Sequence, residues 1–289
     1  SAYNVAVGAN AGAAVTTGTF NTLIGGLAGD AITTGIRNTT VGHQSLSSNT
    51  TGGLNTALGR SALLSNTTAS NNTAVGYEAL YANTTGTENV AIGMQSCDAQ
   101  TTASYNTALG FDTLSANVLG SRNVAIGRAA LQVMNPASAS NTYNVAIGFG
   151  AGESVTTGVQ NTLIGGLAGD ALTSSNNNIA LGYAALSSNT VSSSNVAIGV
   201  RALTAFNVTS ATSTYNVAIG EDAGAAVTTG QYNTLIGGLA GDGATTASYS
   251  TALGYGSLGG AMTGEGNVAL GVNTLLVATS AHSNTAVGT

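Results

Sequence analysis

The sequence NTAVGYEALYANTTGTENVAIG, residues 72–93, holds the unit that the rest of the chain repeats. Its opening pentad, Asn-(Thr/Val)-Ala-(Val/Ile/Leu)-Gly, begins at Asn72 and returns 17 residues later at Asn89. Each pentad Asn is numbered position 1 here and is termed the anchor. Seventeen anchors follow one another, with fourteen intervals of 17 residues and two of 21. They are Asn4, Asn21, Asn38, Asn55, Asn72, Asn89, Asn106, Asn123, Asn144, Asn161, Asn178, Asn195, Asn216, Asn233, Ser250, Asn267 and Asn284. Spacing this regular marks an internal repeat protein.

The length of the repeat predicts its structure. Seventeen residues are too few for a helical hairpin with its turn, and the β-branched alternation in the pentad indicates a strand. We therefore predict an all-β fold, a parallel β-solenoid of about 17 coils with a 17-residue period, continuous over residues 1–289 as a single domain. Because the first and last residues already lie within the repeat, we expect the chain to be an excerpt of a longer fibre.

Positions 2 and 4 of the pentad are expected to face the core of the coil. Position 4 is Val, Ile or Leu in all seventeen copies, and a strand places positions 2 and 4 on one face. Position 3, which is Ala in thirteen copies, would then point outward. A small, apolar column on an outer face predicts contact with further copies of the same chain, in a cyclic homo-oligomer.

Two further pentad positions carry structural signals. The anchor is Asn in all copies but one, so that stacked coils would place the side-chain amides in a hydrogen-bonded ladder. Position 5 is Gly in every copy, as needed where the chain turns with positive φ or where backbones approach closely. Both positions are predicted to stabilise the fold and not to bind a ligand.

Composition narrows the function classes. Only 6% of residues are charged, 43% are hydrophobic and the net charge is −6, with five arginines and no lysine, so neither disorder nor nucleic-acid binding is expected. The sequence contains no run of about 18 apolar residues, so no membrane-spanning helix is expected. Cys97 is the single cysteine, and His43 and His282 stand at opposite ends. We therefore expect no catalytic residue, cofactor or metal site, and no enzymatic activity.

The NVAIG and NTAIG-like pentads, with a downstream small residue and Leu or Gly, resemble the head repeats of trimeric autotransporter adhesins. They are equally similar to the collar and shaft repeats of bacteriophage tail fibres. The resemblance covers the whole chain, although the period here is longer than in those heads, which implies an enlarged turn. It implies a left-handed β-roll, a homotrimer, an extracellular location on a cell surface or virion, and a structural attachment role toward a host surface glycan or receptor.

Aromatic residues follow the period in two lines. One line immediately precedes the anchor, and the other immediately follows the pentad Gly. They are interpreted either as packing ladders or as a glycan-stacking stripe, which makes a carbohydrate-binding module the alternative function. The candidate glycan contacts are Tyr77, Tyr183 and Tyr255. An ice-binding solenoid with a Thr-rich face is a third hypothesis. It is less favoured because Val freely replaces Thr at position 2.

Two four-residue insertions, 135–138 and 207–210, account for the longer intervals. They are expected to protrude as loops, which are favoured places for recognition. The alternative is tolerated variation in length. The candidate recognition residues are Asn135, Pro136, Asn207 and Thr209.

The decapeptide NTLIGGLAGD occurs three times, at 21–30, 161–170 and 233–242. Its last six residues, GGLAGD, resemble the calcium loops of bacterial β-rolls. The acid is offset by one residue from that motif and follows only some coils, so oxygen ligands are too few for a calcium shell. No metal site is predicted there.

Overall fold

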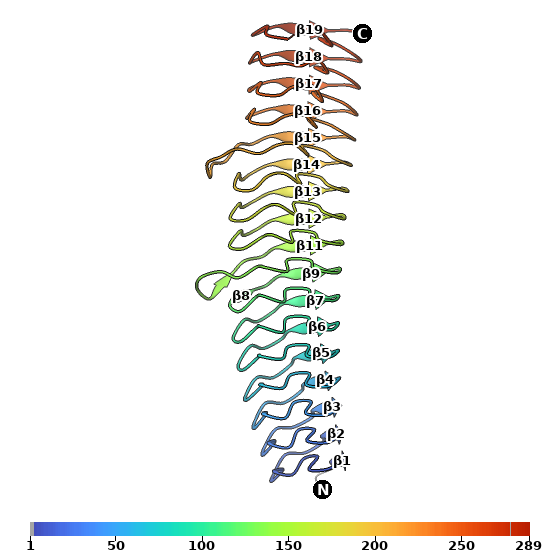
Figure 1. Cartoon of the computed structure of the whole chain (residues 1–289), viewed down its shortest axis with the longest axis vertical. Coiled ribbons are helices and arrows are strands. Elements are labelled where there is room, and N and C mark those ends of the chain that lie inside the picture. The colour runs from blue at the N-terminus through green and yellow to red at the C-terminus, as the bar shows by residue number, and fades with distance from the viewer. Residues whose placement is uncertain (1–2, 278) are drawn as a thin grey trace. The chain divides into compact units, whose positions relative to one another are not determined.

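The computed structural model describes residues 3–277 and 279–289, and every element in that part of the chain is a β-strand. Two compact units divide the chain, Ser1–Tyr143 and Asn144–Thr289. Each is a parallel β-solenoid whose coils stack one on the next (Figure 1). Together they contain about 17 coils with a 17-residue period, which confirms the predicted fold class. Nowhere in the described ranges is there a helix that could span a membrane.

Each coil contributes one three-residue strand, formed by positions 2 to 4 of its pentad, and the two-residue strands Gly120–Ser121 and Ser140–Asn141 pair separately, outside the pentads. The first unit contains β1 (Val5–Val7), β2 (Thr22–Ile24), β3 (Thr39–Val41), β4 (Thr56–Leu58), β5 (Thr73–Val75), β6 (Val90–Ile92), β7 (Thr107–Leu109), β8 (Gly120–Ser121), β9 (Val124–Ile126) and β10 (Ser140–Asn141). The second contains β11 (Val145–Ile147), β12 (Thr162–Ile164), β13 (Ile179–Leu181), β14 (Val196–Ile198), β15 (Val217–Ile219), β16 (Thr234–Ile236), β17 (Thr251–Leu253), β18 (Val268–Leu270) and β19 (Thr285–Val287). Equivalent positions of successive coils are paired, as Ala74 is with Ala91, so the repeat itself sets the register.

The faces of these strands are the reverse of those predicted. Position 3 lies inside the coil, where Ala74 and Ala91 are completely buried. Position 4 points outward, so that Leu58 and Leu109 are 44% and 43% exposed. The prediction of a core at positions 2 and 4, and of an intermolecular column at position 3, was therefore wrong. The anchor Asn is buried, and strand alternation then brings position 3 to the same inner side. Because the interior is narrow, that position is small.

The coil interior is filled by complementary pairs. Leu46, Leu63, Leu80 and Leu114, all at position 9, are completely buried and hold the left-handed backbone conformation. Where position 3 is Leu instead of Ala, position 9 is Gly in that coil and the preceding one. A Cβ on Gly12 would lie 2.6 Å from Cδ1 of Leu23. Gly29 with Leu23, Gly169 with Leu163, and Gly224 and Gly241 with Leu235 repeat this arrangement. Leu at position 3 and Gly at position 9 of the decapeptide are therefore a core-packing variant of the usual Ala and Leu.

The predicted amide ladder at the anchors is present. Oδ1 of Asn161 accepts hydrogen bonds from the backbone N–H of Asn178 at 3.0 Å and from its side-chain amide at 3.2 Å. The Asn161 amide also donates to the carbonyl of Ser175, 14 residues further along, at 2.8 Å. The ladder bonds coil to coil and closes each coil on itself, so it holds both register and cross-section.

A second amide ladder, at position 12, was not predicted from the sequence. The amide of Asn66 donates to Oδ1 of Asn49, and that of Asn83 donates to Oδ1 of Asn66, both at 2.9 Å. Each of the three also donates to a carbonyl three residues further along its own coil. Gln100 follows, and its Oε1 accepts from the amide of anchor Asn106 at 2.9 Å, which joins the two ladders. The recurrence of Asn at this position was the signal available.

The position 5 glycines meet both predicted requirements. Gly76 has φ of +135°, and a Cβ there would lie 2.5 Å from the carbonyl oxygen of Gly93 in the next coil. The coils are thus as close at this corner as backbones can come, and no other residue fits.

Candidate functional site

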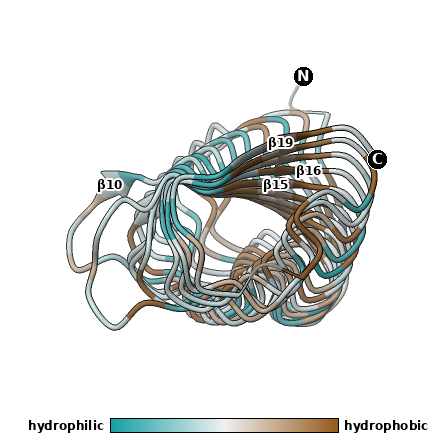
Figure 2. Ribbon diagram, turned by 90° about the horizontal axis from the view of Figure 1, so that it is seen from above, coloured by the Kyte–Doolittle hydropathy of each residue, from teal (hydrophilic) through white to brown (hydrophobic). Residues whose placement is uncertain are grey.

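The outward side of the strands forms an uncharged surface, here called the sheet face and defined by positions 2 and 4. Position 2 is Thr, Val or Ile and position 4 is Val, Ile or Leu in every coil. Their side chains range from partly to largely exposed, as in Ile92 at 37% and Leu253 at 50%. Figure 2 shows the labelled strands β15, β16 and β19 as hydrophobic along their length. Each unit therefore presents a flat, largely apolar surface to its surroundings.

Aromatic and aliphatic side chains at position 6 and immediately before each anchor flank the sheet face. The residue before the anchor is called position 17 here, and in the two 21-residue coils the same label is kept for Tyr143 and Tyr215. Among the described residues, all but five of the exposed large hydrophobic side chains lie at positions 17, 2, 4 or 6. The exceptions are Ile36, Tyr81, Val133, Leu276 and Val277. Exposed apolar surface is thus concentrated on one side of each coil and not scattered over the turns.

The line at position 17 is a set of packing ladders. Tyr215, Tyr232 and Tyr249 stack in sequence, with ring centroids 5.9 and 5.0 Å apart and interplanar angles of 20° and 5°. In the first unit, the guanidinium of Arg122 lies 4.5 Å from the Tyr105 ring centroid and 5.9 Å from that of Tyr143. Because neighbouring groups cover the ring faces, this line offers few faces to a sugar, which favours the packing interpretation.

At position 6, the candidate glycan contacts have different environments. The guanidinium of Arg60 lies 5.5 Å from the ring centroid of Tyr77 and occupies that face. Tyr183 and Tyr255 instead follow coils whose position 6 is Gly. A Cβ on Gly166 would lie 3.5 Å from Cδ2 of Tyr183, and one on Gly238 would lie 3.4 Å from Cδ2 of Tyr255. These two rings, 55% and 56% exposed, border a gap where one side chain is missing.

The gap beside Tyr255 is a pocket of about 260 Å³, lined by Glu221, Asp222, Gly238, Leu239 and Tyr255. We refer to it as the Tyr255 pocket. Its acidic wall belongs to one coil, its glycine floor to the next and its tyrosine to the coil after that. It therefore combines an aromatic surface with two carboxylates, a combination that sequence spacing alone did not reveal.

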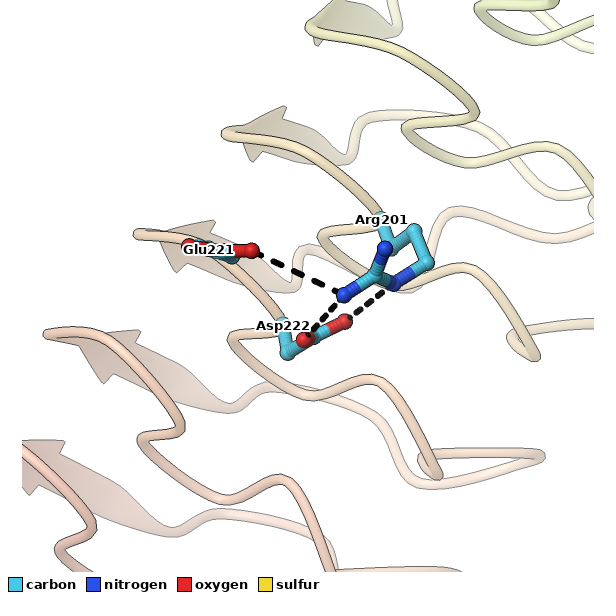
Figure 3. A network of polar contacts seen from close by, with 3 residues as sticks. All are labelled: Arg201, Glu221 and Asp222. Atoms are coloured by element: carbon cyan, nitrogen blue, oxygen red, sulfur yellow. Dashed lines mark hydrogen bonds and ion pairs between the residues drawn. The ribbon is translucent and has the colours of Figure 1, made fainter.

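Arg201 orders the acidic wall of the pocket (Figure 3). Its Nε donates to Oδ1 of Asp222 at 2.7 Å and its Nη2 donates to Oδ2 at 2.6 Å, a bidentate pair. Nη2 also lies 3.7 Å from Oε1 of Glu221, whose side chain is 70% exposed. The hydrogen bonds from Arg201 hold the pKa of Asp222 below its ordinary value. Asp222 is therefore fixed and ionised, while Glu221 keeps free lone pairs toward solvent.

The two insertions bulge beyond the neighbouring coils of their own units, after β9 and after β14 (Figure 1). Oδ1 of Asn135 accepts from the backbone N–H of Val118, and Oδ1 of Asn207 accepts from that of Thr190. Both asparagines thus tie the loops to the preceding coil. Of the four candidate recognition residues, Asn135, Asn207 and Thr209 are exposed, and Pro136 is buried.

Other polar groups do not converge. In the described part of the chain, no three His, Cys, Asp or Glu side chains lie close enough to share a metal ion. Burial raises the pKa of the Cys97 thiol to about 12, which leaves it protonated and unreactive. The acids of the three decapeptides, Asp30, Asp170 and Asp242, lie at position 10 of separate coils.

Partly buried aspartates at position 10 predict an unusual pH dependence. Burial raises the pKa of Asp98 and Asp170, and Oδ1 of each is buried without a hydrogen-bond partner. The folded state then binds more protons than the unfolded state, so the stability contributed by these groups falls as pH rises above about 4. We expect the double variant Asp98→Asn, Asp170→Asn to melt at a higher temperature than the wild type at pH 7, and at the same temperature near pH 3.

The control for this prediction is Asp222→Asn, which should act in the opposite direction. The lowered pKa of Asp222 means that its carboxylate stabilises the fold above its unfolded pKa and that this contribution is lost as pH falls through the folded value. Thermal melts of both variants between pH 3 and 7, near the ordinary carboxyl range, measure the two signs. A lower melting temperature for the Asn pair at neutral pH would contradict the prediction.

Comparisons of the chain with protein-family models, with curated proteins and with solved structures gave no match. The geometry of the sheet face and of the Tyr255 pocket is therefore the main support for a function.

Proposed function

We propose that this chain is a structural segment of an extracellular fibre, a rigid shaft or head that self-associates through its sheet face and has no catalytic role. The observation that carries the proposal is the sheet face itself, uncharged at positions 2 and 4 of every coil and bordered by further exposed apolar residues. The β-solenoid fold is compatible with a fibrous module.

The sheet face extends over every coil. Monomeric soluble proteins rarely expose a contiguous apolar patch larger than a few hundred Å². Here Val, Ile and Leu recur at one outward position with the spacing of the coils, about 4.8 Å. A second copy of the chain carries the same spacing, so its side chains can interdigitate with these over many coils. Covering by identical chains would remove the apolar surface from water along the whole face.

The resemblance of the pentads to adhesin heads and phage tail-fibre repeats supports three chains around one axis. Three identical faces meeting at an axis make a closed assembly, whereas non-closing contacts would continue into filaments. The same resemblance supports a location on a cell surface or virion, with attachment to a host surface glycan or receptor.

Charge placed on the sheet face is expected to dissociate the assembly. The wild type should have a native mass of three times the 28.0 kDa chain. The double variant Leu58→Glu, Leu109→Glu should run as the 28.0 kDa monomer, because both side chains are outward and burying unpaired carboxylates is costly. Light scattering or native mass spectrometry measures both.

The matched control is Thr68→Glu, Thr85→Glu, which adds the same charge at exposed turn positions. This variant should keep the wild-type mass. A monomeric wild type, or glutamate variants of the sheet face that remain assembled, would reject self-association through this face.

Carbohydrate binding is a second candidate function. Its candidate site is now the Tyr255 pocket and no longer the whole of the tyrosine lines. The observation that favours it is the juxtaposition of an exposed Tyr255 ring with the Glu221 and Asp222 carboxylates around one pocket.

A further inference from the structure

We propose that the Tyr255 pocket binds one pyranose ring of a glycan, stacked on Tyr255 and hydrogen-bonded by Glu221 and Asp222. This inference rests on the carbohydrate-binding candidate and names its site. It is independent of self-association, which native mass tests separately.

The floor of the pocket is formed by a glycine that the fold does not require. Each decapeptide contains adjacent glycines, here Gly237 and Gly238. Gly237 is required by the fold, because its φ is +134° and a Cβ would lie 2.5 Å from the carbonyl oxygen of Gly254. Gly238 has no positive φ, and its Cβ would make an ordinary contact at 3.4 Å with the Tyr255 ring. Neither backbone conformation nor close packing explains the second glycine.

Other coils confirm that position 6 accepts large residues. Arg60, Tyr77 and Met94 occupy it in three successive coils of the first unit. Glycine at this position therefore removes a side chain that the fold could carry. The missing side chain leaves a notch in the column of position 6 side chains. The notch lies between the position 6 side chain of the preceding coil and that of the following coil.

The three decapeptides share this notch but differ in its walls. The second glycine is Gly26, Gly166 or Gly238, and the neighbouring position 6 residues are Ala9 and His43, Phe149 and Tyr183, or Glu221 and Tyr255. Of these three notches, the third joins an aromatic ring to a carboxylate, and Asp222 stands next to Glu221 in the same wall, paired with Arg201 of the preceding coil.

The chemistry of the walls fits a sugar. The exposed Tyr255 ring offers an apolar surface to the C–H face of a pyranose. The Glu221 and Asp222 carboxylates accept hydrogen bonds, and Arg201 of the preceding coil holds Asp222 in place. Sugar hydroxyls donate hydrogen bonds, so they can pair with these carboxylates. Because Arg201 offsets one of the two negative charges, the wall suits a neutral hydroxylated ligand better than an organic cation.

Dimensions limit the ligand to a single ring. The walls stand two coils apart, about 10 Å between backbones, and the side chains take up part of that gap. A volume of about 260 Å³ lies at the lower end of ligand pockets. We therefore expect recognition of one terminal or protruding residue of a glycan.

The test uses the whole 289-residue chain in its native assembly. Methyl pyranosides of glucose, galactose, mannose and N-acetylglucosamine are titrated separately by saturation-transfer-difference NMR. At least one should bind with a dissociation constant on the order of 1 mM, as the small contact area allows. Tyr255→Ala and Gly238→Met should each weaken that binding at least tenfold, the second by filling the notch as Met94 does in its own coil.

Two controls separate the possible outcomes. Tyr77→Ala removes a position 6 tyrosine whose face Arg60 covers, so it should leave binding unchanged. Gly238→Met should melt at the wild-type temperature, which shows that lost binding is not lost folding. Sugar binding that survives both pocket variants would overturn this site while leaving the carbohydrate candidate intact.

The remaining outcomes overturn the ligand assignment. No pyranoside signal at about 10 mM, roughly tenfold above the expected constant, would reject both the site and the carbohydrate candidate. Choline binding at Tyr255 with silent pyranosides would show a cation site instead of a sugar site.

Discussion

Replacing Gly237 with alanine is expected to destabilise the second unit by about 3 kcal/mol or more, which would be seen as a large fall in its melting temperature. The backbone at Gly237 has φ of +134°, a region that side chains with a Cβ rarely adopt. The new Cβ would also lie 2.5 Å from the carbonyl oxygen of Gly254 and 2.7 Å from its carbon. Backbone atoms on both sides are held by the strand pairing, so relief requires the coils to separate.

The adjacent glycine supplies a matched control. Gly238→Ala adds the same methyl group one residue later, where it meets only the movable Tyr255 ring at 3.4 Å. Its melting temperature, followed by far-UV circular dichroism, should stay near that of the wild type. Equal melting temperatures for the two variants would contradict the assignment of position 5 as the corner that only glycine can form.

Removing one rung of the anchor ladder is expected to cost about 2–6 kcal/mol. Asn161 is completely buried, and Asn161→Ala leaves the backbone N–H of Asn178 and the carbonyl of Ser175 without their partners at 3.0 and 2.8 Å. Each buried orphan group costs about 1–3 kcal/mol. Denaturant unfolding of the variant measures the loss.

The chain itself contains the control for this prediction. Ser250 takes the anchor position in one coil, and its Oγ accepts from the backbone N–H of Asn267 at 3.4 Å. Asn161→Ser should therefore keep part of the ladder and lose less stability than Asn161→Ala. A serine variant as unstable as the alanine variant would show that the anchor acts through packing and not through hydrogen bonds.

Periodicity made the fold predictable from the sequence. The interval of 17 residues set the coil length, the strand at the pentad and the pairing of equivalent positions, as in Ala74 with Ala91. Asn and Gly at positions 1 and 5 were correctly assigned to a ladder and a corner, because few other structures require one residue type at every repeat.

The inner and outer faces were not predicted correctly. The largest aliphatic side chains of the pentad, at position 4, were expected to fill the core. In this coil the interior is narrow, and the buried anchor forces Ala at position 3 inward. The recurrence of Ala at position 3, on the same strand face as the anchor Asn, was the signal in the sequence. It indicates a narrow interior only once the anchor is known to be buried.

The sequence by itself therefore determined the solenoid, its period and its stacking register, since hydrogen bonding between identical coils depends only on local spacing. Only the tertiary structure decided which side of the strand faces water, because alternation defines two faces but not which one is enclosed. It also decided which tyrosines have open faces. Glu221, Gly238 and Tyr255 come from three successive coils, and stacking alone brings them to one pocket.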